Sequence, residues 1–240
     1  LVSRVDEIWH CAASFKFQER YREEIAAHNI TGTRHLLDFA VLCNHQKVTP
    51  VFHVSTAYAA PLREGLVREE LPITMTPFRN RYEWSKQEAE RLVSVYREQF
   101  DLPVAIFRLS IIMGHSHTGR ASRFTGYYDV IRAIYLLTHS LEINLGDHFD
   151  RNLHLRILAK STVRLNVVPI DFVVEAMWRL SRSERGAAWI FNITNDHPPL
   201  LDYLFAQACK PLAVTGITLV DEAAFQQQPM SGLERIFNRK

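Results

Sequence analysis

Three short apolar runs, separated by two long segments of helical periodicity, dominate the first half of this sequence. The apolar runs cover residues 5–10, 51–56 and 104–109, and the helical segments cover residues 19–43 and 82–99. Strands that are apolar on both faces are typical of parallel sheets covered by helices on each side. The alternation of strand and helix predicts βαβ units, and therefore an α/β fold with a doubly wound parallel sheet.

The second half has a less regular pattern. We expect a polar loop over 114–126, helices over 128–137 and from 170 onward, and short strands at 165–168, 188–193 and 216–220. Asp171 follows Pro169 and Ile170 at the start of the second helix. A carboxylate there either caps the helix or is favoured by its positive end.

Two counts exclude whole classes of function. The chain has 9 Gly, and no two of them fit G-x-G-x-x-G or G-x-x-x-x-G-K, so neither glycine-rich phosphate loop is present. Lys plus Arg total 28 and Asp plus Glu total 26. The resulting net charge of +2 provides no electrostatic basis for binding nucleic acid.

The cysteines and the apolar runs indicate the compartment. Cys11, Cys43 and Cys209 are widely spaced and form no C-x-x-C pair, which argues against a disulfide framework and a cysteine-based zinc site. No apolar run approaches the roughly 18 residues of a membrane-spanning helix, and the N-terminus has no signal-peptide pattern. We therefore expect a soluble, cytoplasmic protein.

Tyr82 and Lys86 are the most informative pair of residues. They stand four positions apart and therefore share one face of the expected helix. A phenol is a poor acid or base at neutral pH, but a neighbouring ammonium favours the phenolate and lowers the pKa. The pair predicts general acid–base chemistry on a hydroxyl or carbonyl group. The alternative interpretation is a surface tyrosine that packs over a lysine stem.

Further polar residues occur at positions where a site is expected. Ser55 and Thr56 end a predicted parallel strand, where open α/β sheets bind ligands, and a hydroxyl there could hold a substrate oxygen. Asn29 and Gly32 lie in the middle of the first helix, although both residue types disfavour helices. A role in packing or in a site is one explanation, and a tolerated kink is the other.

These residues occur in an order that resembles a known superfamily. The motifs are His10-Cys11-Ala12-Ala13, Asn29-x-x-Gly32-Thr33, Val54-Ser55-Thr56, Tyr82-x-x-x-Lys86, Arg108-Leu109-Ser110-Ile111-Ile112-Met113-Gly114 and Asn166-Val167-Val168-Pro169-Ile170-Asp171-Phe172-Val173. Over about residues 5–195 the chain resembles the extended short-chain dehydrogenase/reductase superfamily. The Ser-Thr-Ala-Tyr and Val-Pro-Ile-Asp-Phe-Val segments are most similar to its thioester-reductase and fatty acyl-CoA reductase branch, also called male-sterility-type.

The resemblance implies roles for individual residues. Tyr82 matches the catalytic acid–base, and Lys86 matches the residue that lowers its pKa and holds the nicotinamide ribose. Thr56 matches the hydroxyl that orients the substrate carbonyl, with Ser55 as the second choice.

The resemblance also implies a cofactor, NADP, with NAD as the alternative. The residues that correspond to cofactor contacts include Tyr82 and Lys86. The other contacts are Cys11, Ala12 and Ala13 near the adenine ribose, Leu109, Ile111 and Ile112 near the nicotinamide, and Asn29 in a supporting role.

The matching motifs divide the chain. Residues 1–115 correspond to the C-terminal part of a Rossmann-type NAD(P)-binding domain whose first strands and glycine-rich loop are absent. Residues 116–240 correspond to a small α/β substrate-binding portion interleaved with the last sheet strands. At about 30 residues per βαβ unit, we expect at least about 60 further residues upstream in the natural protein. The chain as given is expected to bind a dinucleotide poorly.

The implied activity is NAD(P)H-dependent reduction of an acyl thioester, as acyl-CoA or carrier-bound, to an aldehyde or alcohol. One alternative is another enzyme of the superfamily, such as a nucleotide-sugar epimerase or dehydratase or a hydroxysteroid-type dehydrogenase. The other is a non-catalytic dinucleotide-binding regulator, against which the intact Thr56, Tyr82 and Lys86 argue.

The loop over 114–126 holds two further features. His115 and His117 are not spaced as a metal motif, so we expect no metal site. Arg120 and Arg123 could contact a phosphate of the cofactor or of a pantetheine carrier, but a solvated basic loop is the simpler interpretation.

Overall fold

The structure is a computed structural model that describes residues 1–60, 65–72, 77–122, 124, 126–183 and 189–237. The chain divides into two compact units. Unit 1 contains residues 1–116 and 168–195, and unit 2 contains residues 117–167 and 196–240. The sequence places a division at 115/116, and the segment 168–195 belongs with unit 1. That the two parts serve cofactor and substrate respectively stays a prediction.

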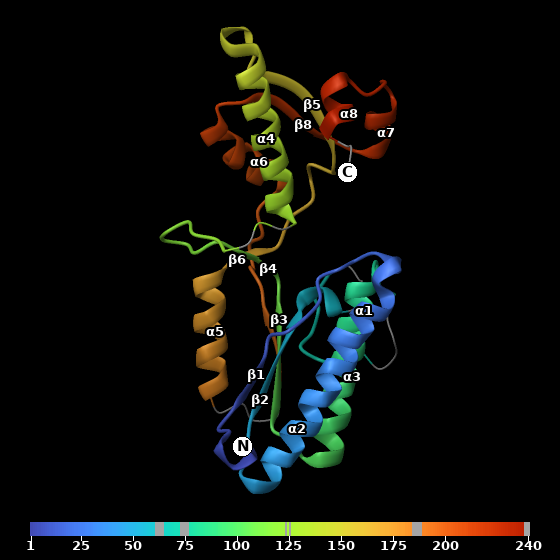
Figure 1. Cartoon of the computed structure of the whole chain (residues 1–240), viewed down its shortest axis with the longest axis vertical. Coiled ribbons are helices and arrows are strands. Elements are labelled where there is room, and N and C mark those ends of the chain that lie inside the picture. Colours follow the sequence, from blue (N-terminus) through green and yellow to red (C-terminus); the bar gives the residue numbers. More distant parts are fainter. Residues whose placement is uncertain (61–64, 73–76, 123, 125, 184–188, 238–240) are drawn as a thin grey trace. The chain divides into compact units, whose positions relative to one another are not determined.

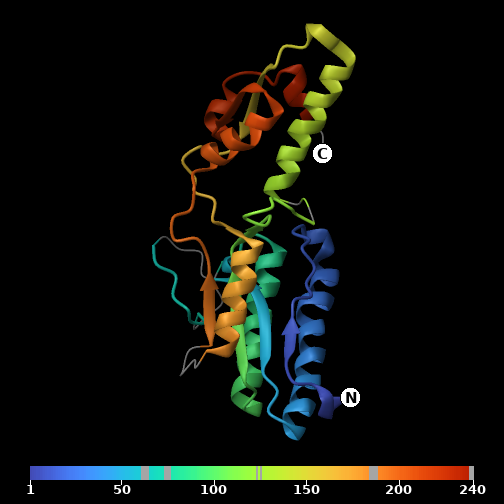
Figure 2. The same ribbon diagram turned by 90° about the vertical axis from the view of Figure 1, so that its left-hand side faces the viewer.

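A parallel sheet forms the centre of unit 1. Its strands are β1 (Ile8–His10), β2 (Val51–Thr56), β3 (Val104–Leu109) and β7 (Ile190–Ile193), in the order β1-β2-β3-β7. All three pairings are parallel, and Thr56 at the end of β2 lies opposite Leu109 of β3. Figure 2 shows β1 in blue and β7 in orange at the two edges. The predicted parallel α/β sheet is confirmed.

Helices cover both faces of this sheet. The helices α1 (Arg22–Ala26), α2 (Gly32–Gln46) and α3 (Arg81–Phe100) lie on one side, and α5 (Ile170–Arg182) lies on the other (Figure 1). Alternate residues of β3 serve the two sides: Val104 and Ile106 pack with α2 and α3, whereas Ala105 and Phe107 pack with α5. Burial on both faces explains why the strands are continuous apolar runs.

Several short elements complete unit 1. They are the 3-10 helices η1 (Val2–Arg4), η2 (Glu19–Tyr21) and η4 (Ala57–Ala59), the π-helical turn η3 (Ala27–Thr31), and strand β4 (Ile111–Met113), which pairs with β6 (Val167–Pro169). The helix predicted over 19–43 is thus a succession of 3-10, α, π and α segments. The sequence does not predict strand β4, because it is only three residues long and directly follows β3.

Unit 2 is built around its own core. It contains the helices α4 (Tyr127–Leu145), α6 (Leu201–Cys209), α7 (Glu222–Gln226) and α8 (Gly232–Phe237), the 3-10 helices η5 (Gly146–His148) and η6 (Lys210–Leu212), and the parallel strands β5 (Asn152–Leu158) and β8 (Thr215–Val220). The hydrophobic core of unit 2 is a cluster separate from those of unit 1. Its buried residues are Ile134, Leu153, Leu155, Phe205, Cys209 and Val214.

Unit 2 differs from the sequence prediction in two places. Helix α4 continues eight residues beyond the predicted end at 137, to Leu145. Strand β5 is an addition to the predicted elements, although Leu153, Leu155 and Ile157 alternate with polar residues, which is the pattern of a half-buried strand. Strand β8 agrees with the predicted strand at 216–220.

Candidate active site

The carboxyl end of β2 and the first turns of α3 bring the predicted catalytic residues together. Helix α3 begins after Asn80, whose side-chain oxygen accepts a hydrogen bond from Glu83 N at 2.9 Å. This cap places Tyr82 in the first turn, next to Thr56, and places Lys86 one turn later. Open α/β sheets bind ligands at this edge, so the cluster is a candidate active site.

The phenol of Tyr82 is buried beneath two aromatic rings. The residue is 9% exposed, and the ring centroids of Phe15 and Phe17 lie 5.7 and 5.6 Å from its own. Burial raises the pKa of Tyr82 to about 12, although the hydrogen bond with Thr56 lowers it. The sequence predicts a pKa lowered by Lys86. The structure reverses that direction, because desolvation of the phenol dominates.

Lys86 is directed at the sheet. It is 2% exposed, and its Nζ donates a hydrogen bond to Val54 O at 2.8 Å. Burial lowers the pKa of Lys86 to about 8, and the charges of Glu90 and Cys11 act in the opposite direction. An ammonium has three N–H donors. Within the part of the chain that the structure describes, one of them is used.

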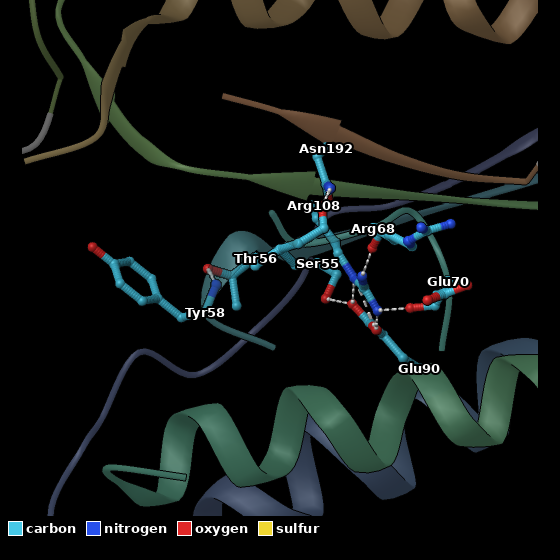
Figure 3. A network of polar contacts seen from close by, with 9 residues as sticks. Ser55, Thr56, Tyr58, Arg68, Glu70, Glu90, Arg108 and Asn192 are labelled. Atoms are coloured by element: carbon cyan, nitrogen blue, oxygen red, sulfur yellow. Dashed lines mark hydrogen bonds and ion pairs between the residues drawn. The ribbon is translucent and has the colours of Figure 1, made fainter. Parts of the chain in front are cut away.

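Ser55 and Thr56 have different surroundings although they are neighbours. Ser55 Oγ donates to Glu90 Oε1 at 2.5 Å, whereas Thr56 Oγ1 accepts from Tyr58 N at 3.3 Å and lies next to Tyr82, eight residues before Glu90 on α3. Figure 3 shows Ser55 joined to Glu90 and Thr56 beside Tyr58. Of the two hydroxyls proposed from the sequence, Thr56 is the one next to Tyr82.

Glu90 and Arg108 form a buried ion pair behind Ser55. Arg108 Nη2 lies 2.7 Å from Glu90 Oε2, and the two side chains are 0% and 1% exposed. Neither residue has a role predicted from the sequence. Two signals mark them: Glu90 stands four residues after Lys86, and Arg108 is a cation within an apolar run. A buried charge needs a partner, so a charged residue in a core strand indicates an ion pair.

The same guanidinium holds a loop at the sheet edge. Arg108 Nη2 donates to Glu70 O at 3.2 Å, and Nη1 lies 3.5 Å from Arg68 O (Figure 3). Asn192 of β7 adds two contacts, because its N donates to Glu69 Oε1 at 2.6 Å and its Nδ2 donates to Val67 O at 3.2 Å. Residues 67–70 are therefore attached to the carboxyl ends of β3 and β7.

Asn29 lies in the π-helical turn η3 and is buried. Its side-chain oxygen accepts from Ser14 N at 2.7 Å, and Nδ2 donates to Ser14 O at 3.0 Å and to Ser85 Oγ at 2.9 Å. The unfavourable mid-helix Asn thus connects the segment after β1, the turn η3 and helix α3. A π-helical turn in an α-helix frequently marks a functional position.

The other residues expected near a cofactor fall into two groups. Cys11 and Ala12 are exposed directly after β1, Ala13 and Ile111 are half-buried, and Ile112 is exposed. By contrast, the side chains of Leu109 and Asn29 are buried, the first in the core between the sheet and α5 and the second in its hydrogen bonds. Contact of these last two side chains with a cofactor stays a prediction.

Some of the residues in the candidate site have the chemistry that binding of a dinucleotide requires. Lys86 is a buried ammonium with N–H donors beyond the one given to Val54 O, which suits ribose hydroxyls. Cys11 and Ala12 are open at the carboxyl end of β1. Lys86 thus fits the nicotinamide ribose, and the open Cys11 and Ala12 fit a contact near the adenine ribose. The sequence offers no glycine-rich loop for the pyrophosphate.

Two buried histidines lie beside Lys86. His10 Nε2 is 2.9 Å from Thr33 Oγ1, and the His10 and His53 rings are 5.2 Å apart. Burial and then the charge of Lys86 lower the pKa of His10 to about 4, and the same two causes place the pKa of His53 well below its ordinary value. Both imidazoles are therefore neutral at neutral pH and add no positive charge to the site.

Asp171 does not cap helix α5. The N-cap position is Pro169, and the Asp171 carboxylate instead accepts hydrogen bonds from Ser116 Oγ at 2.6 Å and Ser116 N at 2.8 Å. The hydrogen bonds from Ser116 lower the pKa of Asp171 to about 2. The carboxylate still lies in the first turn, where the positive helix end favours it.

Metal-binding clusters and membrane-spanning helices are both absent from the described residues. No group of three or more His, Cys, Asp or Glu side chains is placed there to hold a metal ion. In the same residues, no helix has the length and apolar character needed to span a membrane. Arg123, one of the two loop arginines considered for phosphate, lies outside the described residues, and Arg120 is exposed.

Comparison with known proteins gave consistent matches. A linear gramicidin synthase protein of Brevibacillus parabrevis is 27% identical over 86% of this chain, and fatty acyl-CoA reductase 2 of Homo sapiens is 25% identical over 81%. The crystal structure of the terminal R domain from the myxalamid PKS-NRPS biosynthetic pathway covers 94% of this chain with a TM-score of 0.72 and 23% identity. This chain spans 4% and 40% of the two relatives and 52% of the R domain.

The family model of the male sterility proteins matches residues 1–177. This range contains the strands β1 to β6 and the residues Ser55, Thr56, Tyr82, Lys86 and Glu90 of the candidate site. The chain therefore belongs to the male sterility protein family.

Proposed function

We propose that this chain carries the carbonyl-reducing site of an NADPH-dependent reductase that converts an acyl thioester into an aldehyde, with the alcohol as the product of a second reduction. The thioester is an acyl-CoA or is bound to a carrier protein, and NADH is the alternative reductant. The observation that carries the proposal is the placement of Tyr82 next to Thr56, with Lys86 one turn along α3, at the carboxyl end of a parallel sheet.

The names of the relatives support this choice of reaction. Fatty acyl-CoA reductase 2 matches 81% of this chain, and an alcohol-forming fatty acyl-CoA reductase of Simmondsia chinensis is 38% identical over 28% of it. The substrate is inferred from the family and the site together. The alternative, a nucleotide-sugar epimerase, is distinguished by the substrate panel described below.

The protonation state of Tyr82 suits reduction. With a pKa of about 12, the phenol keeps its proton at neutral pH and is a proton donor. We assign it the transfer of that proton to the substrate oxygen as negative charge develops there, while Thr56 holds the same oxygen by a hydrogen bond. Hydride on the carbonyl carbon and a proton on the oxygen give a hemithioacetal, and loss of the thiol releases the aldehyde.

Lys86 has a holding role in this scheme. When bound, NADPH supplies the hydride. The N–H donors of Lys86 that Val54 does not use would bind the ribose hydroxyls. Near neutral pH a group with a pKa of about 8 is mostly protonated, so the ammonium also favours negative charge at the substrate oxygen.

Substitution of Tyr82 tests the proposal. Tyr82→Phe keeps the ring that packs against Phe15 and Phe17 but removes the proton donor. In the full-length protein, we expect turnover to fall by at least about 10²-fold while NADPH still binds. The measurement is the loss of NADPH absorbance with a panel of acyl-CoAs, nucleotide sugars and ketones, together with fluorescence titration of NADPH.

The panel also selects among the alternatives. Reduction of acyl-CoAs alone supports the proposal, and turnover of nucleotide sugars or ketones alone would assign another reaction of the superfamily. If Tyr82→Phe turns over acyl-CoA at the rate of the unaltered protein, the catalytic role of Tyr82 is wrong. Binding of NADPH without turnover of any substrate would indicate a non-catalytic dinucleotide-binding protein.

A further inference from the structure

The segment of residues 11–18, which joins β1 to η2, is attached to the helical turn that carries Tyr82. Asn29 exchanges two hydrogen bonds with the backbone of Ser14, at 2.7 and 3.0 Å, and donates a third to Ser85 Oγ at 2.9 Å. Ser85 in turn donates to Tyr82 O at 2.8 Å. One buried amide therefore sets the position of this segment relative to the phenol.

The segment presents two aromatic rings to the site. Phe15 and Phe17 both pack against the ring of Tyr82, yet they are 59% and 53% exposed. Lys16 between them is directed elsewhere, because its Nζ pairs with Glu24 at 2.7 Å. Each phenylalanine thus covers the phenol with part of its surface and leaves the rest open. Two adjacent exposed aromatic rings beside a reacting group are a favourable apolar contact surface.

A groove continues from this surface. It has a volume of about 240 Å³ and is lined by Phe17, Glu19, Phe78, Arg79, Asn80 and Arg81. Its two cations are neutralised, because Arg79 pairs with Glu83 at 2.9 Å and Arg81 pairs with Glu19. The Arg81 guanidinium also lies 5.6 Å from the centroid of the Phe78 ring. Because both cations already have partners, the groove is poorly suited to a phosphate, and Phe17 and Phe78 supply its apolar surface.

Phe17 belongs both to the surface over Tyr82 and to the groove. We propose that Phe15 and Phe17 are specificity-determining residues that form the wall for the acyl chain of the thioester, with the groove beyond Phe17 receiving the distal part of that chain. The inference rests on the proposed function, since the carbonyl carbon must be held at Tyr82 and Thr56 for the chain to extend along this wall.

Chain-length preference tests the proposal. Phe17→Ala removes the shared part of the wall, and we expect kcat/KM for palmitoyl-CoA to fall at least about tenfold more than kcat/KM for butyryl-CoA. Phe15→Ala is expected to act in the same direction. Phe100→Ala is the matched control, because Phe100 is also exposed, at 43%, but lies at the other end of α3. It should leave both values unchanged.

A second variant guards against a folding defect. Phe17→Leu keeps an apolar side chain and should retain most of the preference for palmitoyl-CoA, with an unchanged midpoint of urea unfolding. Equal losses for the two substrates in Phe17→Ala would show that the ring only supports Tyr82, and the proposal would be overturned. No change for either substrate would overturn it as well.

A binding measurement separates this inference from the proposed function. Calorimetric titration with non-reducible thioether analogues of palmitoyl-CoA and butyryl-CoA measures how tightly each acyl chain binds, without turnover. If the long analogue binds more tightly and Phe17→Ala removes the difference, the wall is supported even where no acyl thioester is reduced, and only the proposed reaction fails. If the two analogues bind equally to the unaltered protein, the wall is wrong.

Discussion

At the scale of single residues, the two adjacent hydroxyls at the end of β2 have separable roles. Ser55 belongs to the buried ion pair of Glu90 and Arg108, and Thr56 belongs to the surroundings of Tyr82. They contact different parts of one helix, since Tyr82 lies in the first turn of α3 and Glu90 lies eight residues further along it. A substitution at one position should therefore affect stability, and a substitution at the other should affect catalysis.

Thr56→Ala and Ser55→Ala make this prediction testable. Thr56→Ala removes the hydrogen bond that we propose to the substrate oxygen, and we expect kcat to fall by about 10²–10³-fold with little change in the unfolding midpoint. Ser55→Ala leaves a buried carboxylate without one donor and should lower the free energy of unfolding by about 1–3 kcal/mol. Acyl-CoA reduction assays and urea unfolding measure the two effects. The reverse pattern would assign the catalytic hydroxyl to Ser55.

At the scale of elements, the ion pair of Glu90 and Arg108 joins α3, β3 and the loop at residues 67–70. Arg108→Met leaves Glu90 buried without its partner, and we expect unfolding to become easier by about 3–5 kcal/mol. It also removes the contacts to Arg68 O and Glu70 O, so trypsin should cleave after Arg68 more quickly. Urea unfolding and timed proteolysis measure these effects.

A double variant is the control for this prediction. Arg108→Met combined with Glu90→Leu replaces the pair by apolar side chains, and much of the lost stability should return because no uncompensated charge remains. The contacts of the loop are not restored, so cleavage after Arg68 should stay fast. If the double variant is as unstable as Arg108→Met, packing rather than the unpaired charge explains the loss.

The elements also show which features the sequence could predict. The long parallel strands and α3 are predictable, because burial on both faces and helical periodicity leave clear patterns in residues 51–56, 82–99 and 104–109. The position of Asn29 in a π-helical turn is a tertiary effect. Its helical propensity is poor, and the bonds to Ser14 and Ser85 that compensate come from segments distant in the chain.

The same distinction applies within the candidate site. Tyr82 and Lys86 are found from local spacing, because their relation is fixed by one helix. The direction of the pKa shift of Tyr82 could not be predicted in this way, since it depends on burial by Phe15 and Phe17 from another segment. For the same reason, the choice of Thr56 over Ser55 as the neighbour of Tyr82 depends on where the end of β2 lies relative to the first turn of α3.

At the scale of the whole molecule, the two units have separate cores and can be followed separately. All four tryptophans, Trp9, Trp84, Trp178 and Trp189, belong to unit 1. Tryptophan fluorescence therefore reports unfolding of unit 1, whereas far-ultraviolet circular dichroism reports both units. A chain with two cores need not unfold in one step. A substitution confined to unit 2 should move only the part of the dichroism signal that fluorescence does not follow.

Glu234 offers such a substitution. This residue of α8 accepts hydrogen bonds from Arg156 Nε at 2.7 Å and Arg156 Nη2 at 2.8 Å, which attach the helix to β5. The hydrogen bonds from Arg156 are the main cause that lowers the pKa of Glu234 from 4.5 to about 2. A lowered carboxylate pKa stabilises the fold above the unfolded value, and this stabilisation is lost as pH falls from about 4.5 to about 2.

Glu234→Gln should remove this pH dependence from unit 2 alone. At neutral pH, we expect the variant to show a lower urea midpoint by circular dichroism and an unchanged midpoint by tryptophan fluorescence. As pH falls from about 6 to about 3, the dichroism midpoint of the unaltered protein should decline more than that of the variant, because glutamine does not titrate. If the fluorescence midpoint moves together with the dichroism midpoint in the variant, the units unfold as one, and the separate cores do not act independently.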